Sequence, residues 1–383
     1  MKWLITGGCG FLGTSLIKQI ITEGGHKIRV IDNLTVGTRD DLAAVSSFIE
    51  LPMSEQINET QGKHGAVIAS EAKQSSYLHK AHHSGSPRPC GARDDDLDRR
   101  PASSHSPSKE EGWGEGASVQ LIVGDILDDR LALIAAQGAD VIVHFAANTG
   151  VGPSVENPRM DCVTNVIGTL NYLEAARHNG VKRFVFASSG APVGECEPPI
   201  HEEKVPHPVS PYGASKLAGE GYCSAYFRTF GIETVALRFG NVYGPGSGHK
   251  NSVVAKFIKQ ALTGETLEIY GDGSQTRDFI YIDDLIRAVQ LAATKPNVGG
   301  EIFQIATNTE TTVGEILDLL KAEFAHRGIE NIVYRHGDKR TGDVLRNYSD
   351  TTKAKKILGW EMRTHLPEGV AKTLDYFFSI NWE

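Results

Sequence analysis

KWLITGGCGFLG, residues 2–13, is the stretch that decides the fold of this chain. Its apolar start, Lys2–Thr6, predicts a short buried strand, and the amphipathic run at Thr14–Thr22 predicts a helix. Between them the glycines repeat at every third position, as Gly7, Gly10 and Gly13. Glycines at this spacing allow a tight turn and a close approach of the backbone to a pyrophosphate at the helix N-terminus. The stretch therefore predicts a dinucleotide-binding turn.

A second strand is predicted at Lys27–Ile31, and it leads directly into Asp32. An acid about 20 residues beyond the glycine turn binds the ribose hydroxyls of the adenosine and repels a 2′-phosphate. The sequence therefore predicts NAD rather than NADP, although Arg39 nearby leaves NADP open as the alternative. The residues of this unit expected to contact the cofactor are Gly7, Gly10, Phe11, Leu12, Gly13, Asp32 and Asn33.

The composition argues against several classes of protein. The 383 residues suggest one large domain or two of ordinary size, and the net charge of −8 argues against a general affinity for nucleic acid or anionic membrane. No run of about 18 or more apolar residues occurs, so no segment is expected to span a membrane. The five cysteines are scattered without a C-x-x-C pair, so we expect reduced thiols and a cytoplasmic protein.

A long segment interrupts the alternation of strands and helices. We expect a helix at Asp40–Glu50 and the third strand at Val119–Val123, which is followed by Gly-Asp-Ile. The intervening residues, about Pro52–Ala117, are rich in Pro, Gly, Ser, His and charged residues, and cannot bury enough apolar surface to offset the entropy of ordering. We interpret them as a mostly disordered surface insertion, and their histidines as part of a polar loop rather than a metal site.

The chain then returns to alternating strands and helices. A fourth strand at Val141–Phe145, a helix at Asn165–Asn179 and a fifth strand at Arg183–Ala187 predict an α/β fold with a Rossmann-like, doubly wound parallel sheet. Ligands of such sheets bind outside the carboxyl ends of the strands. The candidate residues at predicted strand ends are Asp32, Asp125, Ile126, Ala146, Ala147 and Ser189.

The segment SPYGASK, residues 210–216, places Tyr212 and Lys216 four residues apart. In a helix they share one face, about one turn apart. A nearby cation stabilises a phenolate, so the pKa of Tyr212 is expected to fall from about 10 towards working pH, which would make it a general base. Taken alone, the spacing favours a solvated lysine beside a half-buried tyrosine, and the functional interpretation depends on the neighbouring motifs.

Together these motifs resemble the extended short-chain dehydrogenase/reductase superfamily. The resemblance rests on the glycine turn, Asp32, the Gly-Asp-Ile segment, Ser188-Ser189 and the Tyr212–Lys216 pair. Three later segments resemble the nucleotide-sugar epimerase/dehydratase branch: LRFGNVYGP at 237–245, GDGSQTRDFIY at 271–281 and RTGD at 340–343. The resemblance covers the chain except for the insertion, and it implies NAD-dependent chemistry on a nucleotide sugar.

The resemblance assigns roles to individual residues. It implies that Tyr212 is the catalytic base, that Lys216 binds the nicotinamide ribose and lowers the tyrosine pKa, and that Ser189 orients the substrate hydroxyl. Guanidinium forks match diphosphate oxygens, which suits the two arginines of the later motifs. The residues that the resemblance places on the substrate are Ser189, Asn241, Val254, Arg277, Arg340, Asp343 and Asn347.

Three reactions of this family compete: 4-epimerisation, 4,6-dehydration and decarboxylation of a nucleotide sugar. The resemblance implies that the last two need acidic residues directly after the serine. Here Gly190, Ala191 and Pro192 follow Ser189, so 4-epimerisation of a UDP-hexose is the favoured reaction. A non-catalytic NAD-binding protein is the alternative of another class, and it would be expected to have lost Tyr212 or Lys216. Val193 stands where the family usually has a tyrosine beside the sugar.

The resemblance also implies the substrate limits and the organisation of the chain. Asn347 falls at a gate position, where a small residue admits N-acetylhexosamines. If the register is shifted by one residue, the adjacent Tyr348 is the gate and the inference is reversed. We expect an NAD-binding domain at residues 1–244 and a smaller, discontinuous substrate domain at 245–383, with about 283–306 returning to the sheet. A homodimer is expected through helices near Asn165–Asn179 and Tyr212–Phe227.

Overall fold

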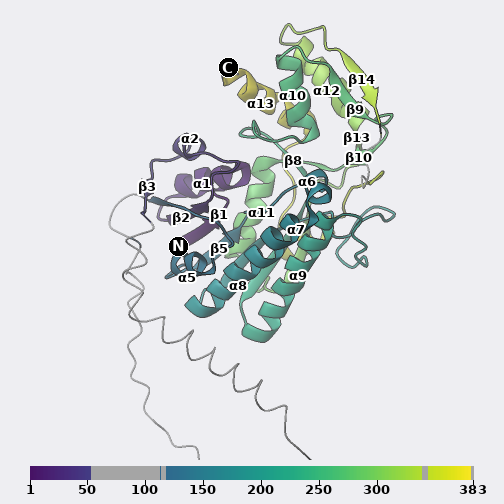
Figure 1. The fold of residues 1–383 in the computed structure, drawn as a ribbon. Coiled ribbons are helices and arrows are strands. Elements are labelled where there is room, and N and C mark those ends of the chain that lie inside the picture. The colour runs from purple at the N-terminus through teal and green to yellow at the C-terminus, as the bar shows by residue number, and fades with distance from the viewer. Residues whose placement is uncertain (53–112, 114–117, 339–343, 381–383) are drawn as a thin grey trace, which may run out of the picture. The chain divides into compact units, whose positions relative to one another are not determined.

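The computed structural model describes residues 1–52, 113, 118–338 and 344–380. One sheet of eight strands, all paired in parallel, runs in the order β12-β7-β6-β5-β1-β2-β4-β3 (Figure 1). Its strands are β1 (Lys2–Thr6), β2 (Lys27–Asp32), β3 (Ile49–Glu50), β4 (Val119–Val123), β5 (Val141–His144), β6 (Arg183–Ser189), β7 (Glu233–Phe239) and β12 (Glu301–Ile305). The chain builds outward from β1 on one side and then restarts at β5 on the other. This order confirms the predicted doubly wound, Rossmann-like sheet and places its switch point between β1 and β5.

Helices cover both faces of the sheet, which explains why its strands are almost continuously apolar. On one face α5 (Asp129–Ala135) packs against α8 (Gly168–Asn179), which packs against α9 (Pro211–Phe230) (Figure 1). On the other face α1 (Phe11–Glu23) packs against α11 (Ile282–Thr294). The shorter helices are α2 (Arg39–Ala43), α6 (Val151–Glu156), α7 (Pro158–Cys162) and the π-helical turns η1 (Val163–Ile167) and η2 (Ala354–Leu358).

The C-terminal part adds three helices that pack on one another and three pairs of short strands. The helices are α10 (Val253–Leu262), α12 (Val313–Ala325) and α13 (Leu366–Ser379). The strand pairs are β8 (Asn241–Tyr243) with β11 (Phe279–Tyr281), β9 (Leu267–Tyr270) with β14 (Tyr334–Gly337), and β10 (Thr276–Arg277) with β13 (Thr311–Thr312). Along the chain these short strands alternate with the helices, and two of them carry expected substrate residues: Asn241 in β8 and Arg277 in β10.

The helix expected at Asp40–Glu50 is wrong in its second half. Helix α2 ends at Ala43, and Ile49–Glu50 forms the edge strand β3 beside β4. A capping box between Thr38 and Asp41 starts the helix, whereas the serines that follow favour local turns over a helix interior.

The expected insertion, Pro52–Ala117, is wrong at one residue. Trp113 is only 2% exposed, and its indole Nε1 donates a hydrogen bond to the Gln137 carbonyl at 2.8 Å. The guanidinium of the buried Arg29 lies 4.2 Å from the centre of the indole ring, and Lys27 Nζ donates to the Trp113 carbonyl. Trp113 therefore belongs to the packed body; the other residues from 53 to 117 lie outside the described part of the chain.

Within the described residues, no helix has both the length and the apolar character required to cross a membrane. The cytoplasmic location stays a prediction.

Candidate active site

The glycine turn joins β1 to α1, and two of its glycines are required by backbone packing. Gly7 has a φ of +69°, and a Cβ there would lie 2.9 Å from the Ala146 nitrogen. A Cβ at Gly13 would overlap the carbonyl oxygen of Gly7 and the Cα of Gly8. Gly10 is the N-cap of α1 and has an extended backbone. The atom nearest to a Cβ added there is the Gly7 carbonyl oxygen, at 3.4 Å, so packing within the protein does not require glycine at this position. The turn is therefore a rigid support with an accessible helix N-terminus.

Asp32 braces this turn from the end of β2. Its carboxylate accepts hydrogen bonds from the backbone N–H groups of Cys9 and Leu34, both at 2.9 Å. Burial raises the pKa of Asp32, while these two hydrogen bonds lower it. Next to it, Asn33 Nδ2 donates to Asp125 Oδ2 at 2.9 Å, which brings the ends of β2 and β4 together.

At the switch point, the residues after β5 lie against the glycine turn. The Ala146 N–H donates to Thr6 Oγ1, and Thr6 also bonds the Nδ1 of the buried His144. Burial lowers the pKa of His144 to about 3, so this ring is neutral. The side chain of Ile126 is buried against Gly168, so its backbone is the part that we expect to face the cofactor.

The structure brings Ser189, Tyr212 and Lys216 together at the end of β6. Ser210 caps α9 by accepting from the Gly213 N–H, which places Tyr212 in the first turn of the helix. The hydroxyls of Ser189 and Tyr212 are hydrogen-bonded. Lys216 is 3% exposed, and its Nζ lies 5.9 Å from the Tyr212 ring centre and donates to the Ala187 carbonyl at 2.9 Å.

The expected fall in the pKa of Tyr212 is wrong for the protein alone. Burial raises the pKa of Tyr212 to about 12, against the smaller lowering effect of the Ser189 hydrogen bond. Burial also lowers the pKa of Lys216 to about 8. We expected the neighbouring cation to decide the pKa of Tyr212, whereas Lys216 is buried and Tyr212 is partly buried, and desolvation disfavours the charged form of each.

A buried ion pair fixes α9 on the sheet. Glu220 and Arg238 are each 2% exposed, and the carboxylate accepts from Arg238 Nε at 2.8 Å and Nη2 at 2.7 Å. The Ser188 hydroxyl donates to the same carboxylate at 2.6 Å. These bonds join β6, α9 and β7 directly beside Ser189.

A cavity of about 200 Å³ in the C-terminal part brings two expected substrate residues together. Asn241 from β8 and Arg277 from β10 line it, with Ser252, Lys256 and Tyr270. Arg277 Nη1 donates to the carbonyls of Thr276 and Val344, which orients its guanidinium. Lys256 Nζ donates to the Tyr270 hydroxyl at 3.2 Å. The cavity thus presents cationic and amide donors suited to a diphosphate.

Three expected substrate residues are placed differently or not at all. The side chain of Val254 is 1% exposed and packs in the core, so it does not line this cavity; its neighbours Ser252 and Val253 do. Sequence alone did not show which side of α10 faces inward. Arg340 and Asp343 lie outside the described residues.

Asn347 lies against the segment that follows Ser189. A Cβ added to Gly190 would lie 3.7 Å from Asn347 Nδ2 and 3.8 Å from its Oδ1. The Asn347 N–H donates to Thr276 Oγ1 at 3.2 Å. Val193, which stands in place of the usual tyrosine, is fully buried beneath this turn. The position after Ser189 is therefore faced by a neutral amide.

A polar network next to the tyrosine was missed from the sequence. Asn165 donates through Nδ2 to Asp161 Oδ1, Ser215 Oγ and the Asn148 carbonyl at 3.0–3.1 Å. Asn165 lies in η1, and a π-helical turn often marks a functional site. Sequence placed Asn165 at a helix start, and no periodicity signal reveals the π-turn that directs it inward.

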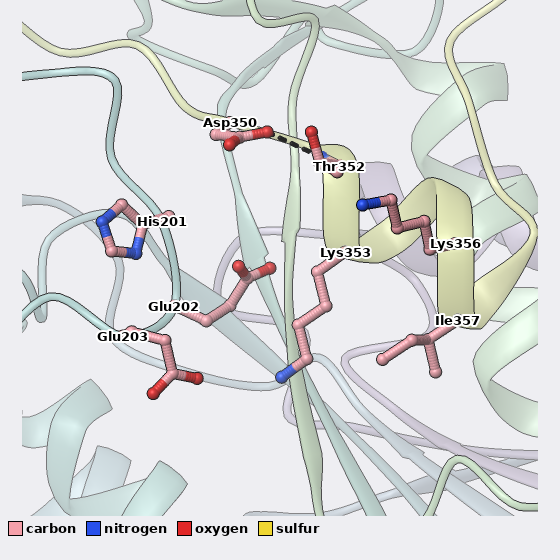
Figure 2. Close-up of a pocket in the computed structure, with 8 residues that line it drawn as sticks. All are labelled: His201, Glu202, Glu203, Asp350, Thr352, Lys353, Lys356 and Ile357. Atoms are coloured by element: carbon pink, nitrogen blue, oxygen red, sulfur yellow. Dashed lines mark hydrogen bonds between the residues drawn. The ribbon is translucent and has the colours of Figure 1, made fainter.

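A second depression of about 330 Å³ lies elsewhere, between residues 201–203 and 350–357 (Figure 2). Figure 2 shows charged side chains on both walls, with Asp350 accepting a hydrogen bond from the Thr352 N–H. None of the predicted site residues within the described chain lines it.

Comparison with known proteins agrees with this geometry. Residues 65–306 match the NAD dependent epimerase/dehydratase family. This chain belongs to that family. The UDP-glucose 4-epimerase of Mycolicibacterium smegmatis is 30% identical over 387 positions, covering 98% of each chain. The structure of the Thermotoga maritima UDP-glucose 4-epimerase with UDP-glucose is similar at a TM-score of 0.74 and 30% identity, over 99% of each chain.

The predicted membership of the nucleotide-sugar epimerase/dehydratase family is confirmed, and NAD as cofactor agrees with the family description. Dehydratases are also relatives: the dTDP-glucose 4,6-dehydratase of Streptomyces antibioticus is 34% identical over 263 residues, 68% of this chain and 76% of that one. The turn between β1 and α1 suits a pyrophosphate, because it is closely packed and no side chain caps the N-terminus of α1.

Two glycine substitutions test the turn. Gly13→Ala should lower both the melting temperature and the NAD affinity, because its methyl group overlaps backbone atoms that cannot move aside. Gly10→Ala is the matched control: its nearest contact is 3.4 Å, so stability should stay within about 0.5 kcal/mol of the parent while NAD affinity falls. Thermal unfolding and calorimetric NAD titration measure both. Equal stability losses in the two variants would contradict this account.

Proposed function

We propose that this protein is a UDP-hexose 4-epimerase that oxidises the sugar transiently to a 4-keto form with bound NAD. The observation that carries the proposal is the cluster of Ser189, Tyr212 and Lys216 at the end of β6, with the neutral Gly190 directly beside it. The family membership and the relatives above support it.

Each residue of the cluster has a role that its position supports. NAD, when bound, supplies the acceptor and later the donor of the hydride at C4. Tyr212 accepts the proton of the 4-hydroxyl, and the Ser189 hydroxyl, already bonded to the phenol, orients that hydroxyl. Lys216 supplies a buried positive charge that favours the phenolate. An ammonium has three donors, so its bond to Ala187 leaves capacity for the nicotinamide ribose.

The remaining assigned residues complete the two binding sites. On the cofactor side we assign Gly7, Gly10, Phe11, Leu12, Gly13, Asp32, Asn33, Asp125, Ala146 and Ala147, with Ile126 through its backbone. On the substrate side Asn241 and Arg277 bind the diphosphate from the cavity that they line. By sequence alone, Arg340 is assigned to the diphosphate and Asp343 to the substrate.

Epimerisation is favoured over dehydration because the site provides one proton-transfer group rather than three. Dehydration across C5 and C6 needs further acid and base groups, and Gly190, Ala191 and Pro192 offer none. The amide of Asn347 faces Gly190 and does not titrate. The 4-keto sugar is therefore expected to turn and receive the hydride on its other face, not to lose water.

A product assay tests this function. Purified protein with UDP-glucose should form UDP-galactose without net formation of NADH, and Tyr212→Phe should be slower by about 10²–10⁴-fold because the proton acceptor is lost. Tyr222→Phe, on the exposed side of α9, is the matched control and should keep the parent rate. NAD binding should survive in both variants. A 4-keto-6-deoxy product would instead establish the dehydratase, and full activity of Tyr212→Phe would refute the assigned base.

We further propose that Asn347 is the gate that admits N-acetylhexosamines. Its amide is near Gly190, whereas Tyr348 uses its carbonyl to pair with the Ile200 N–H, and neighbouring residues of an extended segment point to opposite sides. Asn347→Tyr should lower kcat/KM for UDP-N-acetylglucosamine at least about tenfold, because the larger side chain occupies the space beside C2. UDP-glucose turnover should change far less. An equal loss for both sugars would reject the gate.

A cytoplasmic homodimer is also proposed. Apolar side chains remain exposed on the helices of one face: Met160 of α7 at 54%, Ile167 of η1 at 43% and Phe230 of α9 at 49%. Burying them against a second copy would remove apolar surface from water. Ile167→Asp should convert a dimer to a monomer in sedimentation velocity, whereas Val205→Asp, at a more exposed apolar site elsewhere, should not. A monomeric parent protein would end this proposal.

A further inference from the structure

Asp161 is a buried carboxylate to which the proposed reaction gives no role. It lies in α7 and is 0% exposed. Its Oδ1 accepts a hydrogen bond from Asn165 Nδ2 at 3.1 Å. Its Oδ2 has no hydrogen-bond partner among the residues that the structure describes. Burying a carboxylate is unfavourable unless a positive charge is near. Burial accordingly raises the pKa of Asp161, and the charge of Lys216 acts against this by lowering it.

The network around Asp161 leads to the first turn of α9. Asn165 Nδ2 is 3.0 Å from Ser215 Oγ, and Asn165 also exchanges hydrogen bonds with the backbone of Asn148. The Ser215 hydroxyl in turn donates to the Tyr212 carbonyl at 3.1 Å. Through Asn165, Asp161 is thus connected to Ser215, which lies between Tyr212 and Lys216 in sequence, and to the loop after β5 where the nicotinamide is expected.

Lys216 is the positive charge that Asp161 faces. Two carboxylates act on Lys216: Asp161 from α7 and Glu220 from α9. Glu220 is already held by both nitrogens of the Arg238 fork, so its charge is balanced. Lys216 itself bonds a neutral carbonyl, that of Ala187. Asp161 is therefore the carboxylate whose charge is left to compensate the ammonium.

The other groups that face Lys216 do not supply a compensating charge. His144 of β5 is neutral because burial lowers its pKa to about 3. Burial raises the pKa of the Cys223 thiol, which lies three residues beyond Glu220 and interacts with Lys216, so this thiol is also neutral. Tyr212 is neutral in the resting protein, since burial raises its pKa to about 12.

We propose that Asp161 is a positioning residue for the catalytic pair: its buried charge keeps Lys216 as an ammonium, and its bond to Asn165, which also bonds Ser215, fixes the first turn of α9. The role deepens the proposed function, because it rests on Tyr212 and Lys216 carrying the chemistry.

The direction of the charge effect follows from the surroundings of Lys216. Burial lowers the pKa of Lys216 to about 8, and Asp161 is the largest influence that raises it. A lysine is charged below its pKa and neutral above it. Removing the negative charge of Asp161 must therefore lower the pH at which Lys216 loses its proton.

Asp161→Asn tests the charge without changing the size of the side chain. The rate at which acetic anhydride acetylates Lys216 can be followed by mass spectrometry as a function of pH, because only the neutral amine reacts. We expect the midpoint of this profile to fall by about one pH unit in Asp161→Asn. Glu156→Gln is the matched control, since it removes an exposed carboxylate of the neighbouring α6, and its midpoint should equal that of the parent. A midpoint in Asp161→Asn that is unchanged or higher would overturn the proposal.

The labelling midpoint needs no turnover, so it separates this proposal from the proposed function. A lowered midpoint in a protein without epimerase activity keeps the role of Asp161 and rejects the function. If the protein is an epimerase, the alkaline limb of kcat/KM should move down by the same amount, which a purely structural defect would not cause.

A thermal-unfolding cycle covers poor folding of the variant. If Asp161→Asn is unstable because Lys216 is left uncompensated, the same substitution should be less harmful in a Lys216→Met background. Equal losses in both backgrounds would show that the two side chains are not coupled, and would reject the proposal.

Discussion

The buried bond between Arg238 and Glu220 sets the frame in which every other feature of the site operates. Both side chains are 2% exposed, and one carboxylate binds the guanidinium twice and the Ser188 hydroxyl once. Loss of either partner would leave an uncompensated charge in the interior, at a cost of about 3–5 kcal/mol. Helix α9 therefore cannot slide along β6 and β7. Because Lys216 lies one turn before Glu220, its position beside Ser189 follows from this pair.

The same burial creates the chemical problem that the site must solve. Desolvation disfavours both a charged lysine and a charged phenolate. In the resting protein, the pKa values of Tyr212 and Lys216 are therefore shifted against proton abstraction. A site built this way can act only when further charges enter or are already buried nearby. The positively charged nicotinamide of NAD is one such charge. The carboxylate of Asp161, which the fold itself supplies, raises the pKa of Lys216 and so favours the ammonium, but it also raises the pKa of Tyr212. The burial that excludes water from the site therefore also makes charge compensation necessary.

Features coded by local periodicity could be predicted from the sequence, and features coded by packing could not. The glycine turn, Asp32 and the strand ends are local, because short apolar runs and glycine spacing act over a few positions. The inward side chains of Val254 and Ile126, the end of α2 and the docking of Trp113 depend on contacts distant in sequence. The direction of the Tyr212 pKa failed for the same reason, since sequence shows a lysine four residues away but not the depth of either group.

The long segment connects β3 to β4 at one edge of the sheet, and this position explains how the chain keeps the site despite the insertion. The chain leaves after β3 and returns at Trp113 before β4, and these two strands are paired at one edge of the sheet. Ser189 ends β6, and β2, β1 and β5 stand between β4 and β6. The connection therefore begins and ends at one edge of the sheet, while the cluster of Ser189, Tyr212 and Lys216 lies across the switch point. Trp113 packs on Arg29 and donates a hydrogen bond to the Gln137 carbonyl, which fixes the chain to the body just before β4. Strand β4 then pairs with β2.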